Sequence, residues 1–143
     1  MPTNNTFRTP AVGHGDIHLQ AGSLAVVGSE ANIYGDLTWT GGNLNVGAWM
    51  WDFGTFTIAG NANSMDLSGG GMVTAHAFSW TGGNVDCSVD LFLQAGTFTL
   101  AGGADTFTMD DATMSPGAGG STTWSSGTIV LTNGGSIALG LHV

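Results

Sequence analysis

The sequence predicts an all-β protein: a single-stranded parallel β-solenoid with three short strands per coil of about 21 residues, in five to six coils. Two observations predict this fold. The stretch LTWTGGNL (37–44) returns as FSWTGGNV (78–85) and, less closely, as TTWSSGTI (122–129). Within and between these copies, apolar residues alternate with polar ones, which is the period of a β-strand and not of a helix.

Apolar residues fall into three series with steps of about 21 residues, one series for each predicted strand of a coil. The first series is Leu44, Met65, Val85, Phe107 and Ile129, followed two positions later by Val46, Leu67, Cys87, Met109 and Leu131. The second series is Leu37, Phe56, Phe78, Phe98 and Thr122, followed by Trp39, Ile58, Trp80, Leu100 and Trp124. The third series is less regular: Trp49 or Trp51, Val73, Leu91 or Leu93, Met114, and Ile137 or Leu139. Stacked coils would bury these series as continuous columns.

The second series is the predicted structural ladder of the solenoid. Its aromatic members are Trp39, Trp80, Trp124, Phe56, Phe78 and Phe98. Because large and smaller residues alternate along the tryptophan column, the column would fill a narrow interior without overpacking. The Gly pair that follows Trp39 and Trp80 is typical of a tight corner with positive φ. Cys87, the single cysteine, lies in the first series and is interpreted as a small buried hydrophobe.

The chain divides into two parts by this pattern. Residues 1–15 contain Pro2 and Pro10 and no alternation, so we expect an extended N-terminal arm, and residues 16–143 form the solenoid domain. The first coil is ambiguous, because Leu24 lies too close to Leu37 for a full coil. Leu24 either belongs to an irregular coil or lies in one column with Leu44, and we expect the second arrangement.

Composition excludes several classes of function. Only 8% of the residues are charged, and the net charge is −9 with a single cationic side chain, Arg8. Nucleic acids and anionic membranes bind cationic surfaces, so neither is an expected partner. No apolar stretch is long enough for membrane insertion, and the N-terminus lacks the apolar segment of a signal peptide. The lone cysteine excludes an internal disulfide.

The WTGGN corners and the GTFTI and GTFTL strands (54–58 and 96–100) resemble the parallel β-helix repeats of bacterial adhesins and autotransporter passengers. They are also similar to the β-helical parts of phage tail spikes, fibres and decoration proteins. The resemblance covers residues 16–143 and implies a parallel β-helix, but not one function, since such coils occur in unrelated roles. Adhesins are usually far longer than this chain. The acid clusters of tail-spike enzymes have no convincing counterpart here.

Asp66 and Asp86 are the candidate polar site. We expect them on neighbouring coils, in one outward row with Asn45 and Thr108, about 5 Å apart. Such carboxylates could share a cation such as Ca²⁺, act as an acid–base pair, or face solvent. The sequence lacks the GGxGxD spacing of calcium-binding repeats, and no Lys, Arg or His accompanies the pair. We therefore expect solvated surface, with no catalytic residue and no cofactor.

Threonines form a second candidate surface. Thr38, Thr57 and Thr99 are expected in one outward row with Ser79 and Thr123. A second row would contain Thr40, Ala59, Thr81, Ala101 and Ser125. A flat Thr face resembles the ice-binding surface of some β-solenoid antifreeze proteins, whereas Thr is also common on any exposed strand. The Ala residues interrupt the second row, so ice binding is an alternative and not the preferred function.

Densely placed aromatic residues are the third candidate surface. If Trp49 and Trp51 face inward, alternation turns Met50 and Phe53 outward, with Phe92 near Met50 on a later coil. An apolar outer patch of Met50, Phe53 and Phe92 would be a docking surface. The alternative is an irregular corner that buries these side chains.

From these patterns we expect a non-enzymatic structural or assembly protein. The preferred role is a virion decoration, tail or fibre component, favoured by the Met1 start, the missing export signal and the N-terminal arm. A bacterial surface adhesin or extracellular filament subunit is the first alternative. Open coil ends expose backbone groups and apolar side chains, so we expect self-association or docking to other structural proteins on a virion surface or outside the cell.

Overall fold

The computed structural model describes residues 4–8, 11–13, 15–27, 30–33, 35–47, 49–69, 71–93, 96–117 and 119–138. Within these ranges, only the backbone is described for residues 4–8, 11–13, 26–27, 30–33, 49–53, 61–64 and 93. The strands are β1 (Asn4–Arg8), β2 (Ala11–Gly13), β3 (Ile17–Leu19), β4 (Ser23–Val27), β5 (Glu30–Ile33), β6 (Leu37–Trp39), β7 (Asn43–Val46), β8 (Trp49–Ser68), β9 (Met72–Cys87), β10 (Asp90–Leu93), β11 (Thr97–Asp110), β12 (Thr113–Ser115), β13 (Ser121–Thr132) and β14 (Ser136–Ile137).

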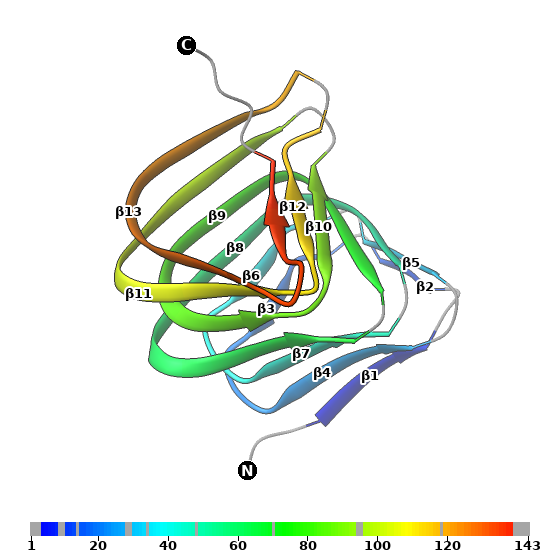
Figure 1. Ribbon diagram of the computed structural model, residues 1–143. Coiled ribbons are helices and arrows are strands. Elements are labelled where there is room, and N and C mark those ends of the chain that lie inside the picture. Colours follow the sequence, from blue (N-terminus) through cyan, green and yellow to red (C-terminus); the bar gives the residue numbers. More distant parts are fainter. Residues whose placement is uncertain are drawn as a thin grey trace.

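The strands wind as successive coils around a common interior, from β1 (blue) to the last strands (orange and red) in Figure 1. Every strand pair in the described ranges is parallel, and all the strands belong to one 14-stranded sheet. These ranges contain no helix. The predicted class, an all-β parallel solenoid, is confirmed.

The later coils do not contain three separate short strands, as the sequence analysis expected. β8 is 20 residues long, β9 is 16, β11 is 14 and β13 is 12, so each of these strands passes through a corner. The corners are marked instead by shifts of register, as between Leu100 and Phe107 where β11 pairs with β9. The backbone stays extended through such a bulge while it changes direction.

The first side of the solenoid, the tryptophan face, is built from β3, β6 and the first halves of the later long strands. Its inward columns are Ile17, Leu37, Phe56, Phe78, Phe98 and Thr122, and Leu19, Trp39, Ile58, Trp80, Leu100 and Trp124. This register confirms the predicted second series and extends it by one coil. Phe78 lies between Phe56 and Phe98 with ring centroids 5.4 and 5.3 Å away, in edge-to-face contacts that favour this stacking.

The second side, the cysteine face, contains β1, β4, β7 and the second halves of the long strands. Its main column is Asn5, Leu24, Leu44, Leu67, Cys87, Met109 and Leu131. The expected pairing of Leu24 with Leu44 is confirmed. The expected pairing of Leu44 with Met65 is wrong, because Leu44 pairs with Leu67. The corner GNANS (60–64) is longer than the corner before Leu44, so β8 reaches this face with its register displaced by two residues.

The third side, the methionine face, contains β2, β5, β10, β12, β14 and the beginnings of β8 and β9. Its column contains Met50, Val73, Leu91, Met114 and Ile137. The third predicted series expected Trp49 or Trp51 beside Val73. Instead, Trp49 pairs with Met72 and Met50 pairs with Val73. The side chains of residues 49–53 and the position Leu139 lie outside the described parts of the chain.

The first strands of the chain are already part of the stack. β1 pairs with β4 and β2 pairs with β5. Among the described residues, paired backbone is therefore present from Asn4, within the segment 1–15 that the sequence analysis assigned to an extended arm. Pairing in a parallel ladder needs backbone N–H and C=O groups and not an apolar pattern, which explains why the side-chain pattern did not mark these strands.

The WTGG motif builds the same corner on alternate coils. The indole N–H of Trp80 donates to the carbonyl of Gly83 at 3.0 Å, and Trp39 and Trp124 donate to equivalent corner carbonyls. The hydroxyl that follows each indole, on Thr40, Thr81 or Ser125, donates to the carbonyl of Leu19, Ile58 or Leu100 on the preceding coil. On the next coil, a Cβ at Gly102 would overlap the Trp80 indole. The coil after Trp80 therefore carries a glycine where the ring lies.

Burial along the tryptophan column ends at the last coil. Trp39 and Trp80 are 0% exposed, but Trp124 is 49% exposed. Trp124 has the predicted register, opposite Leu100, yet the prediction that it is an interior residue is wrong. Among the described strands, β13 pairs only with β11, so none of them covers its other side.

Candidate functional site

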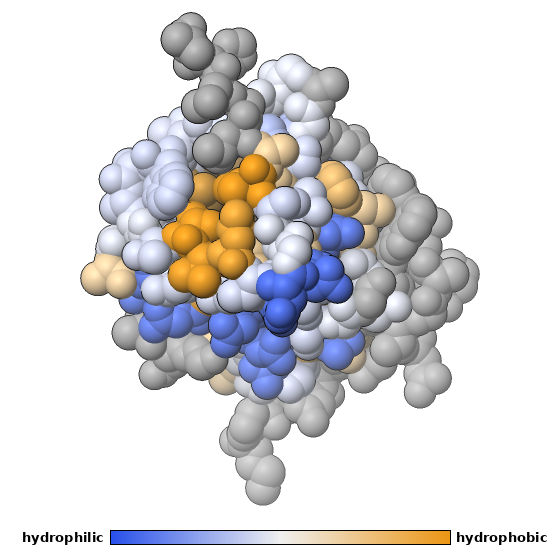
Figure 2. Space-filling model, in the orientation of Figure 1, coloured by the Kyte–Doolittle hydropathy of each residue, from blue (hydrophilic) through white to orange (hydrophobic). Residues whose placement is uncertain are grey.

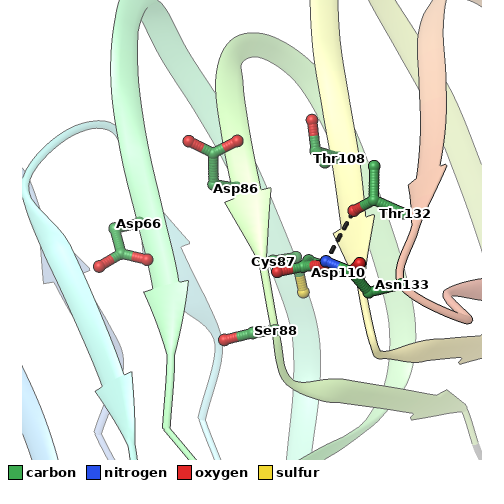
Figure 3. Close-up of a pocket in the computed structure, with 8 residues that line it drawn as sticks. All are labelled: Asp66, Asp86, Cys87, Ser88, Thr108, Asp110, Thr132 and Asn133. Atoms are coloured by element: carbon green, nitrogen blue, oxygen red, sulfur yellow. Dashed lines mark hydrogen bonds between the residues drawn. The ribbon is translucent and has the colours of Figure 1, made fainter.

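The candidate polar site is a hollow of about 310 Å³ on the outside of the cysteine face. It is lined by Asp66, Asp86, Cys87, Ser88, Thr108, Asp110, Thr132 and Asn133 (Figure 3). Parallel pairing places Asp66 beside Asp86, and Asp86 beside Thr108. The lining residues come from β8, β9, β11 and β13 with the turn after it, so the hollow spans four successive coils. The pairing of Asp66 with Asp86 confirms the expected neighbourhood, although Asn43 and not Asn45 precedes Asp66 in the row.

The carboxylates of the hollow differ in their partners. Asp110 accepts hydrogen bonds from the hydroxyl of Thr132, at 2.9 Å, and from the side-chain amide of Asn133. Figure 3 shows Asp66 and Asp86 pointing outward, away from this group. Both are exposed, and no hydrogen bond joins either to another described side chain. Solvent therefore screens the repulsion between two carboxylates on adjacent rungs, which are about 4.8 Å apart.

Cys87 forms the floor of the hollow and points inward. Its thiol is buried and donates to the carbonyl of Val89 at 3.2 Å. Burial, with a smaller contribution from the negative charges of Asp90 and Asp66, raises the pKa of the Cys87 thiol to about 12. A thiol with this pKa stays protonated near neutral pH, and the protonated form is neither a nucleophile nor a metal ligand. The expected role of Cys87 as a buried hydrophobe agrees with its 0% exposure.

The hollow contains carboxylate, hydroxyl and amide groups over the buried thiol of Cys87. No cationic side chain lines it. Within the described ranges, no group of three or more His, Cys, Asp or Glu side chains is arranged to hold a metal ion. A carboxylate pair that faces solvent can attract cations from solution, but its geometry does not enclose one.

Other acidic residues bind backbone groups between coils. Asp16 accepts from the backbone N–H of Asp36 at 3.0 Å, and Asp36 accepts from that of Thr55 at 2.7 Å. Asp90 accepts from Thr113 and Asp105 from Gly83, each at 2.7 Å. These carboxylates fix neighbouring corners, so part of the acidic composition has a structural use. The sequence analysis missed this role, although the Gly-Asp pair at 15–16 and again at 35–36 is a signal for it.

The first threonine row is continuous in register. Thr38, Thr57, Ser79, Thr99 and Thr123 follow one another from coil to coil. The first four are half-buried. The second expected row is broken: Ala59 pairs with Gly82 and not Thr81, and Ala101 pairs with Ser126 and not Ser125. The bulge at each WTGG corner causes these shifts.

The expected apolar patch on the side of the solenoid can be placed only in part. Phe92 is half-buried on β10, between Thr74 and Ser115 in the ladder. Phe53 pairs with Ala75, and Met50 with Val73, in backbone register. The side chains of Met50 and Phe53 lie outside the described residues.

The largest apolar surface among the described residues is at the end of the stack that β13 forms. Trp124 is 49% exposed, Leu131 is 46% exposed and Val130 is 36% exposed. Ile129 and Ile137 lie beside them, partly buried against the core. Figure 2 shows apolar side chains gathered at this end, next to polar ones. We call Trp124, Ile129, Leu131 and Ile137 the apolar end.

Comparisons with known proteins add no assignment to this geometry. The chain matches no family model, no curated protein and no solved structure. In the part of the chain that the structure describes, no helix has the length and hydropathy of a membrane span.

Proposed function

We propose that this protein is a structural, non-enzymatic β-solenoid that presents its sides as surfaces and assembles through its ends. The apolar end is the observation that carries this proposal. Monomeric repeat proteins need terminal repeats with a polar outer face to remain soluble, whereas the last coil keeps the apolar pattern of interior coils. The polar hollow supports the same proposal, because no cationic side chain lines it and the buried thiol of Cys87 stays protonated near neutral pH.

Association in solution tests this proposal. Sedimentation velocity over a wide concentration range is expected to show a rising average mass, and electron microscopy is expected to show rods or arrays. The variant Trp124→Ala is expected to shift the association to higher concentration, and Thr123→Ala, which changes the neighbouring outward residue, serves as its control. A protein that stays monomeric at the highest concentration would contradict the proposal.

The preferred setting for this role is the surface of a virion, as a decoration, tail or fibre component. A bacterial adhesin or extracellular filament subunit has the same physical requirements. Electron microscopy of the native material, with antibody against this chain, separates the two. Label on capsids or tails supports the virion setting, and label on cell-attached filaments contradicts it.

Ice binding remains the other candidate, because the first threonine row is continuous in register. The broken second row leaves a narrow surface, so we favour the structural role. Thermal hysteresis that is abolished by Thr57→Tyr, and not by Asp86→Asn, would reverse this preference.

A further inference from the structure

The tryptophan column alternates an aliphatic residue with a tryptophan, and its last member, Trp124, has no aliphatic residue on its outer side among the described residues. From the first coil to the last it contains Leu19, Trp39, Ile58, Trp80, Leu100 and Trp124. An aliphatic residue lies next to every tryptophan, and Gly102 on the coil after Trp80 leaves room for that ring. The next member of the column, above Trp124, would be aliphatic. Leu19, at the other end of the same column, is such a residue.

The two ends of the stack have matching backbone edges. Among the described strands, β3 pairs only with β6, and β13 pairs only with β11. β3 and β13 are the first and last described strands of the parallel ladder on the tryptophan face. Their free edges therefore face in opposite directions along the stack. Such edges can pair with each other without changing strand direction.

On the cysteine face, β1 is the first strand of the ladder. Register places Asn5 of β1 next to Leu24, where each later coil has Leu44, Leu67, Cys87, Met109 or Leu131. Among the described strands, β1 pairs only with β4, so it is held in the ladder from one side.

We infer that the apolar end docks on the first coil of a second copy of this chain, with Trp124 on Leu19 and Leu131 on Leu24. This inference rests on the proposed function and names the partner and the faces that meet. The contact repeats the established coil-to-coil interface, in which Leu100 lies on Trp80 and Met109 lies on Cys87. Assembly in this manner is head-to-tail, so it produces an open rod and not a closed dimer.

The docking requires the first strands to leave their places. β1 lies on β4 and β2 lies on β5, and in the assembled rod these edges are taken by the second half of β13 and by β14 of the neighbouring copy. β1 and β2 therefore act as a displaceable cap. They cover β4 and β5 in a free protein, and the last coil of a neighbour replaces them.

Cysteine cross-linking tests which faces meet. Adjacent rungs of a parallel ladder are about 4.8 Å apart, within the Cα separation that a disulfide spans. Leu19 and Trp124 lie at opposite ends of one column, so Leu19→Cys and Trp124→Cys in one chain cannot join internally. Under mild oxidation, this double variant is expected to give a series of covalent multimers. Mixing the two single variants is expected to give only a mixed dimer; Cys87 is buried and stays out of the reaction.

Two results of the cross-linking would overturn the inference. Covalent dimers from Trp124→Cys alone would show that two apolar ends meet. Absence of mixed dimers, under conditions where sedimentation shows assembly, would show that other faces associate. In both cases the proposed structural function stands and the head-to-tail arrangement is contradicted. A protein that is monomeric throughout contradicts both the function and the arrangement.

Discussion

Trp80 and Trp124 occupy equivalent corners of the solenoid, but only one of them belongs to the core. Both lie next to Leu100, and both donate the indole N–H to a glycine carbonyl three residues ahead. Trp80 is 0% exposed and Trp124 is 49% exposed. The difference shows that the sequence motif sets the shape of the corner, whereas burial of the tryptophan ring requires a neighbouring coil on each side.

The largest expected difference is in the loss of stability when the tryptophan at each of these two corners is replaced by alanine. Trp80→Ala is expected to lower the free energy of unfolding by about 3–5 kcal/mol, because it leaves a cavity between two covered coils. Trp124→Ala is expected to cost about 1 kcal/mol or less in the monomer. Urea unfolding at a concentration below assembly measures both. Equal costs would mean that the last coil is covered in the free protein.

A glycine beside Trp80 gives a sharper test of the same packing. Gly102→Ala is expected to cost about 1–3 kcal/mol, because its methyl group overlaps the indole. The cost is expected to shrink when Trp80→Phe is present, which is a coupling that a double-mutant cycle measures. Gly103, which has a φ of 66° and no neighbour within 4 Å, provides the control: Gly103→Ala is expected to show no coupling to Trp80.

On the cysteine face, Cys87 lies in a covered coil and Leu131 lies in the exposed last coil, so these two residues allow the same comparison. The pKa of Cys87 is raised from 9.0 to about 12, so the folded state holds its proton where the unfolded state releases it. Stability from this group is complete below pH 9 and is lost as the pH rises toward 12, by about 1.4 kcal/mol per pH unit. Thermal unfolding of the wild type and of Cys87→Ala between pH 8 and 11 measures this slope. The slopes are expected to differ, while Leu131→Ala keeps the wild-type slope.

The smallest expected difference in stability is between aspartates that hydrogen-bond to a neighbouring coil and aspartates that face solvent. Asp36→Ala removes the acceptor for the backbone N–H of Thr55 and is expected to cost about 0.5–1.5 kcal/mol. Asp36→Asn keeps an oxygen acceptor and is expected to lose less. Asp86→Ala is expected to change stability by about 0.5 kcal/mol or less. Chemical denaturation resolves this order, and a larger loss for Asp86→Ala would indicate a bound partner at the hollow.

The architecture and the tryptophan face could be predicted from the sequence because both depend on periodicity. The alternation in GTFTI and GTFTL identified the strands, and the spacing of Trp39, Ile58 and Trp80 identified the column. The register of Leu44 could not be predicted, because the length of the GNANS corner decides it and corners follow no fixed count. Nor does the pattern of one coil indicate whether another coil covers it, which is why Trp124 was assigned to the interior.

The candidate site was predicted only as far as the pair Asp66 and Asp86. The next two coils complete the hollow, with Asp110 from β11 and Asn133 from the turn after β13. A signal was present, since Asp110 lies two positions after Thr108 and residues two apart share one side of a strand.

The two-coil order of the tryptophan column restricts how such a protein can change in length. Removing the coil that contains Ile58 would bring Trp39 against Trp80, so that two large rings would meet where a large and a smaller residue now alternate. Duplication or deletion of one coil is therefore unfavourable, whereas gain or loss of a pair preserves the alternation of this column. Natural variants of this solenoid should accordingly differ in length by even numbers of coils.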